Sequence, residues 1–150
     1  MTAIVTLTEQ HVDSCYEIAR ELEQHYQYPI GGNWTREKIR DEIGQHHGFG
    51  VYDDDDKLCA FCLYRQIPGF SEIMFLATRL NCHRKGTMRA LIKHLMGQIR
   101  EDEGIWLEVH AENLAAIRFY EAVGFVKCGE RPRYYSDGAR ALVFEFKHLR

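Results

Sequence analysis

The stretch from Leu107 to Phe125, LEVHAENLAAIRFYEAVGF, joins a strand pattern directly to a helix pattern. Its first residues alternate as in a β-strand and place a carboxylate, Glu108, inside that strand. The pattern breaks before Asn113, a residue type that favours the start of a helix. An amphipathic helix then runs to Gly124, a residue type that commonly follows a helix end. A strand followed at once by a helix constrains the chain to a layered α/β structure.

Similar patterns recur along the whole chain. Apolar runs and alternation predict seven strands, at residues 3–7, 48–52, 57–65, 71–78, 105–109, 125–131 and 141–146. Apolar residues at helical spacing predict four helices, at residues 8–26, 33–43, 82–100 and 113–123. Thr35 is the expected N-cap of the second of these. The order is strand, two helices, three strands, helix, strand, helix and two strands, without a linker or an internal repeat. The sequence therefore predicts one mixed α/β domain that spans residues 1–150.

The composition is that of a globular protein, with 45% hydrophobic and 27% charged residues. No apolar run approaches the length that spans a bilayer, and the start of the chain does not resemble a signal peptide, so we expect no membrane association. The five cysteines, an odd number, favour reduced thiols and a cytoplasmic location. Cys59 and Cys62 should face opposite sides of one strand, which favours buried structural cysteines over a metal site.

The net charge is only −3, but one segment is strongly basic. No Asp or Glu occurs between Glu72 and Glu101, an interval that contains Arg79, Arg84, Lys85, Arg89, Lys93 and Arg100. A nearly neutral chain with one basic segment favours a small anion as its ligand and not a nucleic acid, because a nucleic-acid surface usually needs a broader basic field.

A turn that contains glycine, Gly86, leads from this basic segment into a predicted helix. The first turn of a helix offers free backbone N–H groups and the positive end of the helix dipole, and both favour a phosphate or pyrophosphate. The neighbouring basic residues are His83, Arg84, Lys85 and Arg89. A strand–turn–helix corner with a solvated basic face explains the same residues, so both interpretations stay open.

Residues of the opening stretch also have two interpretations each. Glu108 shares a strand face with Trp106 and is either a solvent-facing glutamate or a catalytic carboxylate. Tyr120 is either a core tyrosine with its hydroxyl at the edge or a proton donor. Taken singly, each of the two is better explained by packing. His110, where the strand ends, either tunes Glu108 or is solvated, and the second interpretation is favoured.

Two segments taken together resemble a known family. CHRKGTMRALIKHL and WLEVHAENLAAIRFYEAVGF, in this order and at this separation, resemble the GNAT superfamily of acyl-CoA-dependent N-acetyltransferases. The second segment, with RPRYY after it, is most similar to the ribosomal-protein-alanine N-acetyltransferase (RimI) type. The resemblance covers nearly the whole chain and implies the GNAT fold, a single central mixed sheet of about seven strands flanked by four helices. It also implies acetyl-CoA as the cosubstrate.

The family binds the pyrophosphate of coenzyme A at a Gln/Arg-x-x-Gly-x-Gly/Ala loop, which falls here on residues 83–88. Gly86 matches this loop, whereas His83 replaces the usual Gln or Arg and Met88 replaces the second Gly or Ala. The backbone N–H donors survive both changes. The resemblance implies that the cofactor-binding residues are Leu76, Ala77, Thr78, His83, Arg84, Lys85, Gly86, Thr87, Met88, Arg89 and Asn113.

In the RimI type a strand glutamate acts as general base and a helix tyrosine as general acid, and the resemblance places these roles on Glu108 and Tyr120. A protonated amine cannot attack a thioester until it loses a proton, which Glu108 would remove directly or through water. Tyr120 would then supply a proton to the departing thiolate. The expected reaction is direct transfer of the acetyl group, without a covalent acyl-enzyme.

The resemblance implies that the acceptor-binding residues are Trp34, Tyr134 and Tyr135. We expect Trp34 and the loop YPIGGN, residues 28–33, to form one wall of the acceptor site. The acidic dipeptide that usually precedes the last strand in the RimI type is replaced here by Ala139-Arg140. We expect an amine acceptor and lean towards a protein N-terminal amine, with a small-molecule amine as the alternative. A non-catalytic module that binds coenzyme A is a third reading, because of the two departures in the phosphate loop. No metal is expected, and the sequence predicts no particular oligomeric state.

Overall fold

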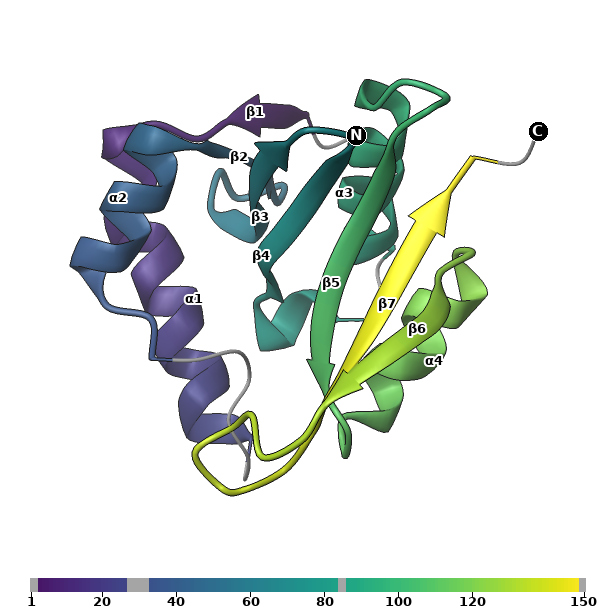
Figure 1. Ribbon diagram of the computed structural model, residues 1–150. Helices are drawn as coiled ribbons and strands as arrows, with labels where there is room; N and C mark the ends of the chain where they lie inside the picture. Colours follow the sequence, from purple (N-terminus) through teal and green to yellow (C-terminus); the bar gives the residue numbers. More distant parts are fainter. Residues whose placement is uncertain (1–2, 27–32, 84–85, 149–150) are drawn as a thin grey trace.

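The computed structural model describes residues 3–26, 33–83 and 86–148. The strands are β1 (Ile4–Thr6), β2 (His47–Tyr52), β3 (Leu58–Ile67), β4 (Phe70–Thr78), β5 (Gly104–His110), β6 (Val126–Arg131) and β7 (Ala141–Lys147). The helices are α1 (Val12–His25), α2 (Arg36–Gln45), α3 (Thr87–Gln98) and α4 (Leu114–Ala122), with two short 3₁₀ helices, η1 (Glu9–His11) and η2 (Leu80–Cys82). The order of strands and longer helices predicted from the sequence is confirmed (Figure 1).

The seven strands form one mixed sheet in the order β1-β2-β3-β4-β5-β7-β6. Neighbouring strands are antiparallel, except that β4 and β5 run parallel. This parallel pairing is short and joins residues 70–72 of β4 to residues 104–106 of β5. After these residues, β4 and β5 no longer pair with each other. Within the described residues, no other strand pairs with the two edges that face one another. The middle of the sheet is therefore open at the ends of β4 and β5.

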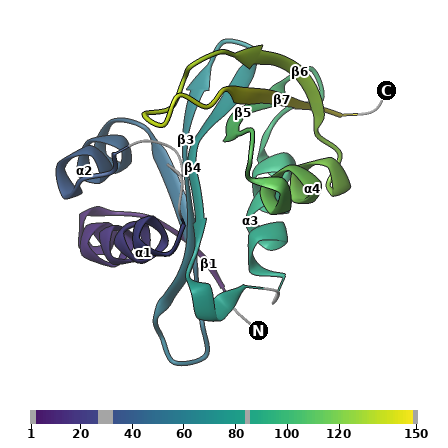
Figure 2. The ribbon, with the colours of Figure 1, turned by 90° about the horizontal axis from the view of Figure 1, so that it is seen from below.

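Helices cover both faces of the sheet, with α1 and α2 on one face and α3 and α4 on the other (Figure 2). The central strand β3 packs Phe61 and Leu63 into the cluster that includes α1, and Cys62 and Tyr64 into the cluster that includes α3. A strand covered on both faces is apolar along its length. In the described part of the chain, no helix has both the length and the apolar character needed to cross a membrane.

The helix caps predicted from the sequence are confirmed. The hydroxyl of Thr35 accepts a hydrogen bond of 3.1 Å from the backbone N–H of Lys38 at the start of α2. Oδ1 of Asn113 accepts one of 3.2 Å from the N–H of Ala116 at the start of α4. Gly124 follows α4 with a φ of +108°, which glycine adopts readily. Asn113 and Gly124 fix the two ends of α4 directly after β5. They therefore also set where Tyr120 lies relative to that strand.

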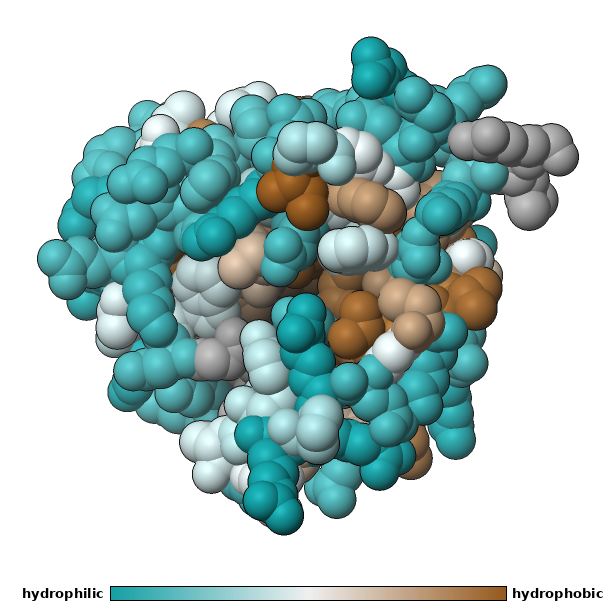
Figure 3. Space-filling view, viewed as in Figure 1, coloured by the Kyte–Doolittle hydropathy of each residue, from teal (hydrophilic) through white to brown (hydrophobic). Residues whose placement is uncertain are grey.

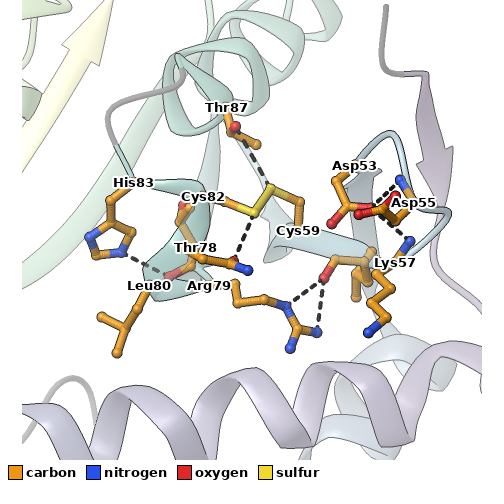
Figure 4. The surroundings of a disulfide bond; sticks show 12 residues. Asp53, Asp55, Lys57, Cys59, Thr78, Arg79, Leu80, Cys82, His83 and Thr87 are labelled. Atoms are coloured by element: carbon orange, nitrogen blue, oxygen red, sulfur yellow. Dashed lines mark hydrogen bonds between the residues drawn. A yellow bond between two sulfur atoms is a disulfide. The ribbon is translucent and has the colours of Figure 1, made fainter.

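The cysteines depart from the expectation of reduced thiols. Cys59 in β3 forms a disulfide bond with Cys82 in η2, so the expectation is wrong for this pair (Figure 4). Cys15 and Cys62 are free and buried, as expected for structural cysteines, and Cys128 is free and exposed. The bonded residues are 23 positions apart, and the pairing of distant cysteines cannot be deduced from spacing alone.

Loss of this disulfide should destabilise the fold. A bond between residues 23 positions apart lowers the conformational entropy of the unfolded chain. This raises the free energy of unfolding by about 3 kcal/mol. Cys82→Ser should therefore lower the midpoint of urea unfolding, and dithiothreitol should lower the wild-type midpoint by a similar amount. Cys128→Ser, a change at an exposed free cysteine, is the control and should leave the midpoint unchanged.

Thiol titration in denaturant checks the bond directly. The chain has five cysteines, of which two are bonded, so three thiols should react before reduction and five after it. Five reactive thiols without any reductant would contradict the disulfide.

Candidate active site

A cavity of about 620 Å³ opens where β4 and β5 separate. Residues 73–78 of β4 and 107–110 of β5 line it, together with the start of α3 and one side of α4. In the space-filling view, apolar side chains lie at the bottom of a hollow near the centre of the molecule, and polar side chains surround them (Figure 3). A cavity of this size and lining suits a small-molecule ligand.

Glu108 lines this cavity from β5, and its side chain is only 23% exposed. Its Oε2 lies 2.9 Å from Nε of Arg131, an ion pair whose orientation falls short of a hydrogen bond, so the buried Oε2 is still able to accept one. Its Oε1 accepts a hydrogen bond of 3.4 Å from the hydroxyl of Tyr134. The carboxylate is therefore held by two side chains from β6 and the segment after it, and is not a freely solvated glutamate.

Arg131 is a residue of the site that sequence reasoning missed. The strand register explains its position, because Glu108 and Gly129 both pair with Val143 of β7. Arg131 lies two residues beyond Gly129 along β6, on the same face of the sheet. It meets Glu108 only because β7 inserts between β5 and β6, which no local sequence signal around Arg131 indicates.

Tyr120 lines the same cavity from α4. It is buried, and its ring packs against three aromatic residues, Phe119, Phe125 and Phe144. Burial raises the pKa of the Tyr120 hydroxyl well above its usual range, and Cys62 and Tyr135 add to this effect. The residue is thus a core tyrosine and also a neutral phenol at the cavity wall, so its two interpretations from the sequence are compatible.

The predicted phosphate-binding turn enters α3 at Gly86, whose φ of +74° is a conformation that glycine adopts readily. The next residues, 87–89, form the first turn of α3 and line the cavity. Backbone N–H groups in a first helical turn have no acceptor within the helix. Met88 is one of these residues, so its backbone donor is in place despite the larger side chain. Arg84 and Lys85 lie outside the described residues.

His83 braces this turn against the sheet. Its Nε2 donates a hydrogen bond of 2.9 Å to the carbonyl oxygen of Thr78 at the end of β4 (Figure 4). The hydroxyl of Thr78 is buried, and it has no hydrogen-bond partner in the described part of the chain. Because Thr78 also lines the cavity, this hydroxyl is a group that a bound ligand can satisfy.

Leu76, Ala77 and Thr78 line the cavity along the edge of β4 that β5 leaves unpaired. Backbone groups on such an edge can bind an extended ligand in the way they bind another strand. Asn113 also lines the cavity, and it caps α4 through Oδ1, whereas its side-chain NH₂ group takes no part in the cap.

The three predicted acceptor-binding residues divide into two groups. Tyr135 is buried and lines the cavity, and Tyr134, which is 51% exposed, reaches Glu108. Trp34 stacks on Phe75 with ring centroids 5.1 Å apart and lines a neighbouring cavity of about 420 Å³. Met74 lines both cavities, so Trp34 lies beside the cavity of Glu108 and not in it. Residues 28–32 of the loop predicted to join this wall lie outside the described residues.

His110 is not solvated, contrary to the interpretation favoured from the sequence. Its side chain is 1% exposed, and its Nε2 lies 2.8 Å from Oδ2 of Asp137. Asp137 is 27 positions away from His110 in the sequence, so the local pattern around His110 could not indicate that the histidine is buried.

Comparison with known proteins decides the family, because residues 10–125 match the family described as "Acetyltransferase (GNAT) family". The chain belongs to the GNAT family. It is similar to the ribosomal protein bS18-alanine N-acetyltransferase of Escherichia coli (strain K12), with 27% identity over 148 residues, which cover 95% of each protein.

Solved GNAT structures share the fold. The crystal structure of the ribosomal-protein-S18-alanine N-acetyltransferase from Escherichia coli matches with a TM-score of 0.84 at 24% identity and covers 100% of this chain and 97% of that one. A PaiA N-acetyltransferase from Thermoplasma acidophilum, in complex with coenzyme A, matches with a TM-score of 0.78 at 18% identity and covers 99% of each chain. The GNAT fold expected from the sequence, with seven strands and four helices, is confirmed.

As a GNAT family member, the chain is an N-acetyltransferase that uses acetyl-CoA. The residues present fit this cosubstrate, because the unpaired edge of β4, the Thr78 hydroxyl and the start of α3 offer hydrogen bonds to a pantetheine arm and a pyrophosphate. Of the eleven predicted cofactor-binding residues, all but Arg84 and Lys85 are described, and these nine line the cavity. Their individual contacts with acetyl-CoA stay a prediction.

Gly86→Ala should weaken acetyl-CoA binding about tenfold, because an L-residue with positive φ costs roughly 1–2 kcal/mol and the turn would rearrange. Gly97→Ala is the matched control, since an added methyl group meets open space at both positions but Gly97 lies within α3 and lacks a positive φ. Its affinity for acetyl-CoA should match that of the wild type in titration calorimetry. Equal dissociation constants for the two variants would contradict the role of this turn.

Proposed function

We propose that the chain transfers the acetyl group of acetyl-CoA directly to the N-terminal amine of a protein or peptide, with Glu108 as general base and Tyr120 as general acid. The observation that carries the proposal is that a held carboxylate and a neutral phenol line one cavity, beside the unpaired edge of β4. A proton acceptor for the amine and a proton donor for the thiolate are what amide formation from a thioester requires.

Glu108 prepares the acceptor amine. An N-terminal amine has a pKa of about 7.7–8.0, so most of it is protonated at neutral pH and cannot attack. Arg131 and Tyr134 hold the carboxylate in one orientation, and its buried Oε2 can accept the hydrogen bond of an incoming ammonium group. Removal of the proton by Glu108, directly or through a water molecule, frees the lone pair for attack on the thioester carbonyl. A backbone N–H group then stabilises the oxyanion that forms.

Tyr120 assists the departure of the thiolate. Burial raises the pKa of its hydroxyl, so the phenol stays protonated across the neutral range and can donate a hydrogen bond at all working pH values. A thiol has a pKa of about 8.5, at least 1.5 units below that of a phenol, so full proton transfer is uphill by at least about 2 kcal/mol. The departing thiolate is therefore stabilised by a hydrogen bond from Tyr120, and the thiol is released after it regains a proton.

Direct transfer agrees with the state of the cysteines. An acyl-enzyme formed on cysteine needs a reactive thiolate at the cavity, and the cysteine that lines the cavity in the described residues, Cys82, is bonded to Cys59. Cys62 is buried in the core and burial raises the pKa of its thiol strongly, which makes it inert.

A peptide N-terminus is the favoured acceptor. The Escherichia coli relative is named for the alanine of a ribosomal protein, and its similarity extends over 95% of both chains. Tyr134 and Tyr135 stand beside Glu108 and the cavity, as an acceptor wall requires. A ribosomal protein as acceptor also favours a cytoplasmic location for this chain. A small-molecule amine is the alternative acceptor.

A mass-spectrometric screen with acetyl-CoA tests this function. It should include peptides with free N-termini that begin with alanine, the same peptides with blocked N-termini, polyamines and aminoacyl compounds. We expect acetylation of the free alanine peptides and none of the blocked ones. Preference for a polyamine would favour the small-amine alternative, and binding of coenzyme A without any acetylated product would favour a non-catalytic module.

Glu108→Gln and Tyr120→Phe should each lower kcat by about a hundred- to ten-thousand-fold, because each removes one proton-transfer group. Steady-state kinetics with the preferred acceptor measures this loss. Glu121→Gln, at an exposed position of α4, and Tyr52→Phe, on the distant strand β2, are the matched controls and should keep wild-type rates.

Full activity of either active-site variant at neutral pH would show that the assigned role is wrong. The pH profile adds a second check. Because the pKa of Tyr120 is raised, its ionisation should cause no fall in the wild-type rate between about pH 8 and 9.5. A fall in this window that disappears in Tyr120→Phe would contradict the proposed donor.

A further inference from the structure

His110 lies at the end of β5, two residues after Glu108 on the same face of the strand, and no step of the proposed reaction uses it. It is buried and lines the cavity. Its ring contacts the carboxylate of Asp137 and the backbone N–H of Glu112, and it stacks on Tyr135 with centroids 4.8 Å apart. A buried histidine beside a carboxylate either transfers protons or ties two segments together, and its hydrogen bonds decide between these roles.

The hydrogen bonds assign the proton of the neutral His110 ring. The backbone N–H of Glu112 can only donate, so Nδ1, at 3.1 Å, accepts and carries no proton. The ring proton is then on Nε2, which donates it to Oδ2 of Asp137 at 2.8 Å. Both ring nitrogens are engaged, and neither offers a lone pair to an acceptor amine. His110 is therefore not a second general base.

Asp137 connects His110 to the loop between β6 and β7. Its Oδ1 accepts a hydrogen bond of 3.0 Å from the backbone N–H of Ala139, and this bond and the one from His110 lower the pKa of the Asp137 carboxyl. The carbonyl oxygen of Ala139 accepts from the N–H groups of Tyr134 and Tyr135, at 3.0 and 3.1 Å. One continuous set of hydrogen bonds thus runs from His110 to the backbone of both tyrosines.

The end of this set of bonds lies at the backbone N–H of Tyr134. The side chain is 51% exposed, so burial contributes little to holding it. Its hydroxyl nevertheless reaches Oε1 of Glu108 at 3.4 Å, which is near the upper limit for a hydrogen bond. A small shift of the loop backbone would break that contact and move the residue away from the carboxylate.

We propose that His110 and Asp137 are positioning residues for the acceptor. Their hydrogen bond holds the loop of Tyr134 and Tyr135 against the end of β5, and so places the wall that an acceptor amine meets beside Glu108. This inference rests on the proposed function, because it takes the acceptor to bind on this side of the cavity. Loss of the bond should weaken acceptor binding and spare acetyl-CoA, which β4 and α3 bind.

Two substitutions of His110 isolate its bond to Asp137. Glutamine can place its amide nitrogen near the position of Nε2 and keep a donor for Asp137. Asparagine is one methylene shorter, so it can accept from the N–H of Glu112 but does not reach Asp137. Both changes remove the ring that stacks on Tyr135. Glutamine keeps the bond to Asp137 and loses the acceptor for the N–H of Glu112, and asparagine does the reverse, so a lower peptide KM in the glutamine variant assigns the effect to the Asp137 bond. Asp137→Ala removes the same bond from its exposed end, together with the bond from the N–H of Ala139.

The substrates for the test are acetyl-CoA and a short synthetic peptide with a free N-terminal alanine. His110→Asn and Asp137→Ala should each raise KM for the peptide about tenfold and leave KM for acetyl-CoA within about twofold. His110→Gln should restore the peptide KM, and the double variant His110→Asn with Asp137→Ala should be no worse than either single variant. Equal peptide KM values for the Asn and Gln variants, or additive single effects, would overturn the proposal.

Hydrogen exchange without substrate separates this proposal from the proposed function. The amides of Tyr135 and Ala139 should exchange about tenfold faster in His110→Asn than in His110→Gln. If the wild type acetylates no amine, the proposed function fails, but hydrogen exchange still tests whether the bond between His110 and Asp137 holds the loop. Equal exchange rates in the two variants would overturn the positioning role of His110 and Asp137, even if the peptide is acetylated. If circular dichroism shows that His110→Asn is unfolded, Asp137→Asn against the wild type decides the question, because asparagine keeps an oxygen that accepts from the N–H of Ala139 and places an NH₂ group, which cannot accept, beside Nε2 of His110.

Discussion

The site depends on the point at which β4 and β5 stop pairing. The two strands share hydrogen bonds at residues 70–72 and 104–106 and have no strand partner on the facing edges beyond these, within the described residues. Backbone groups inside a protein need hydrogen-bond partners, and a ligand can supply here what a neighbouring strand supplies elsewhere in the sheet. Glu108 lies two residues past the last paired residue, Trp106, and β7 still binds its strand on the other edge. The strand that carries the carboxylate is thus held along one edge and open to the cavity along the other.

The two sides of the cavity offer different chemistry. On the β4 side, the groups that can form hydrogen bonds with a ligand are mostly backbone groups of β4 and of the start of α3. The Thr78 hydroxyl lies beside them. On the β5 side they are the side chains Glu108, Arg131 and Tyr134. Backbone donors do not depend on the side chain, so His83 and Met88 leave the N–H groups of the expected phosphate loop in place. Side-chain contacts do not, so differences in acceptor choice are expected on the β5 side.

Local patterns were enough to predict the strands, the helices and the caps at Thr35 and Asn113, because each depends on neighbours within one turn or one strand. The roles of general base for Glu108 and general acid for Tyr120 were predicted from the resemblance of the motifs to a known family, and not from periodicity. The disulfide of Cys59, the ion pair of Arg131 and the burial of His110 could not be predicted, because each joins residues more than twenty positions apart. The disulfide depends on η2, which follows β4 and returns Cys82 to Cys59. The ion pair and the burial of His110 depend instead on strand order, and a single sequence does not reveal that β7 inserts between β5 and β6.

That insertion has a consequence for the stability of the two sides of the site. β6 is the last strand of the sheet and bonds to the rest of it through β7. If β7 opens locally, β6 loses its place, and with it go Arg131 and the loop that carries Tyr134 and Tyr135. Proteins open in such cooperative units at a lower free energy than global unfolding requires. Arg131 and this loop are therefore expected to open together, because one strand, β7, holds both on the sheet.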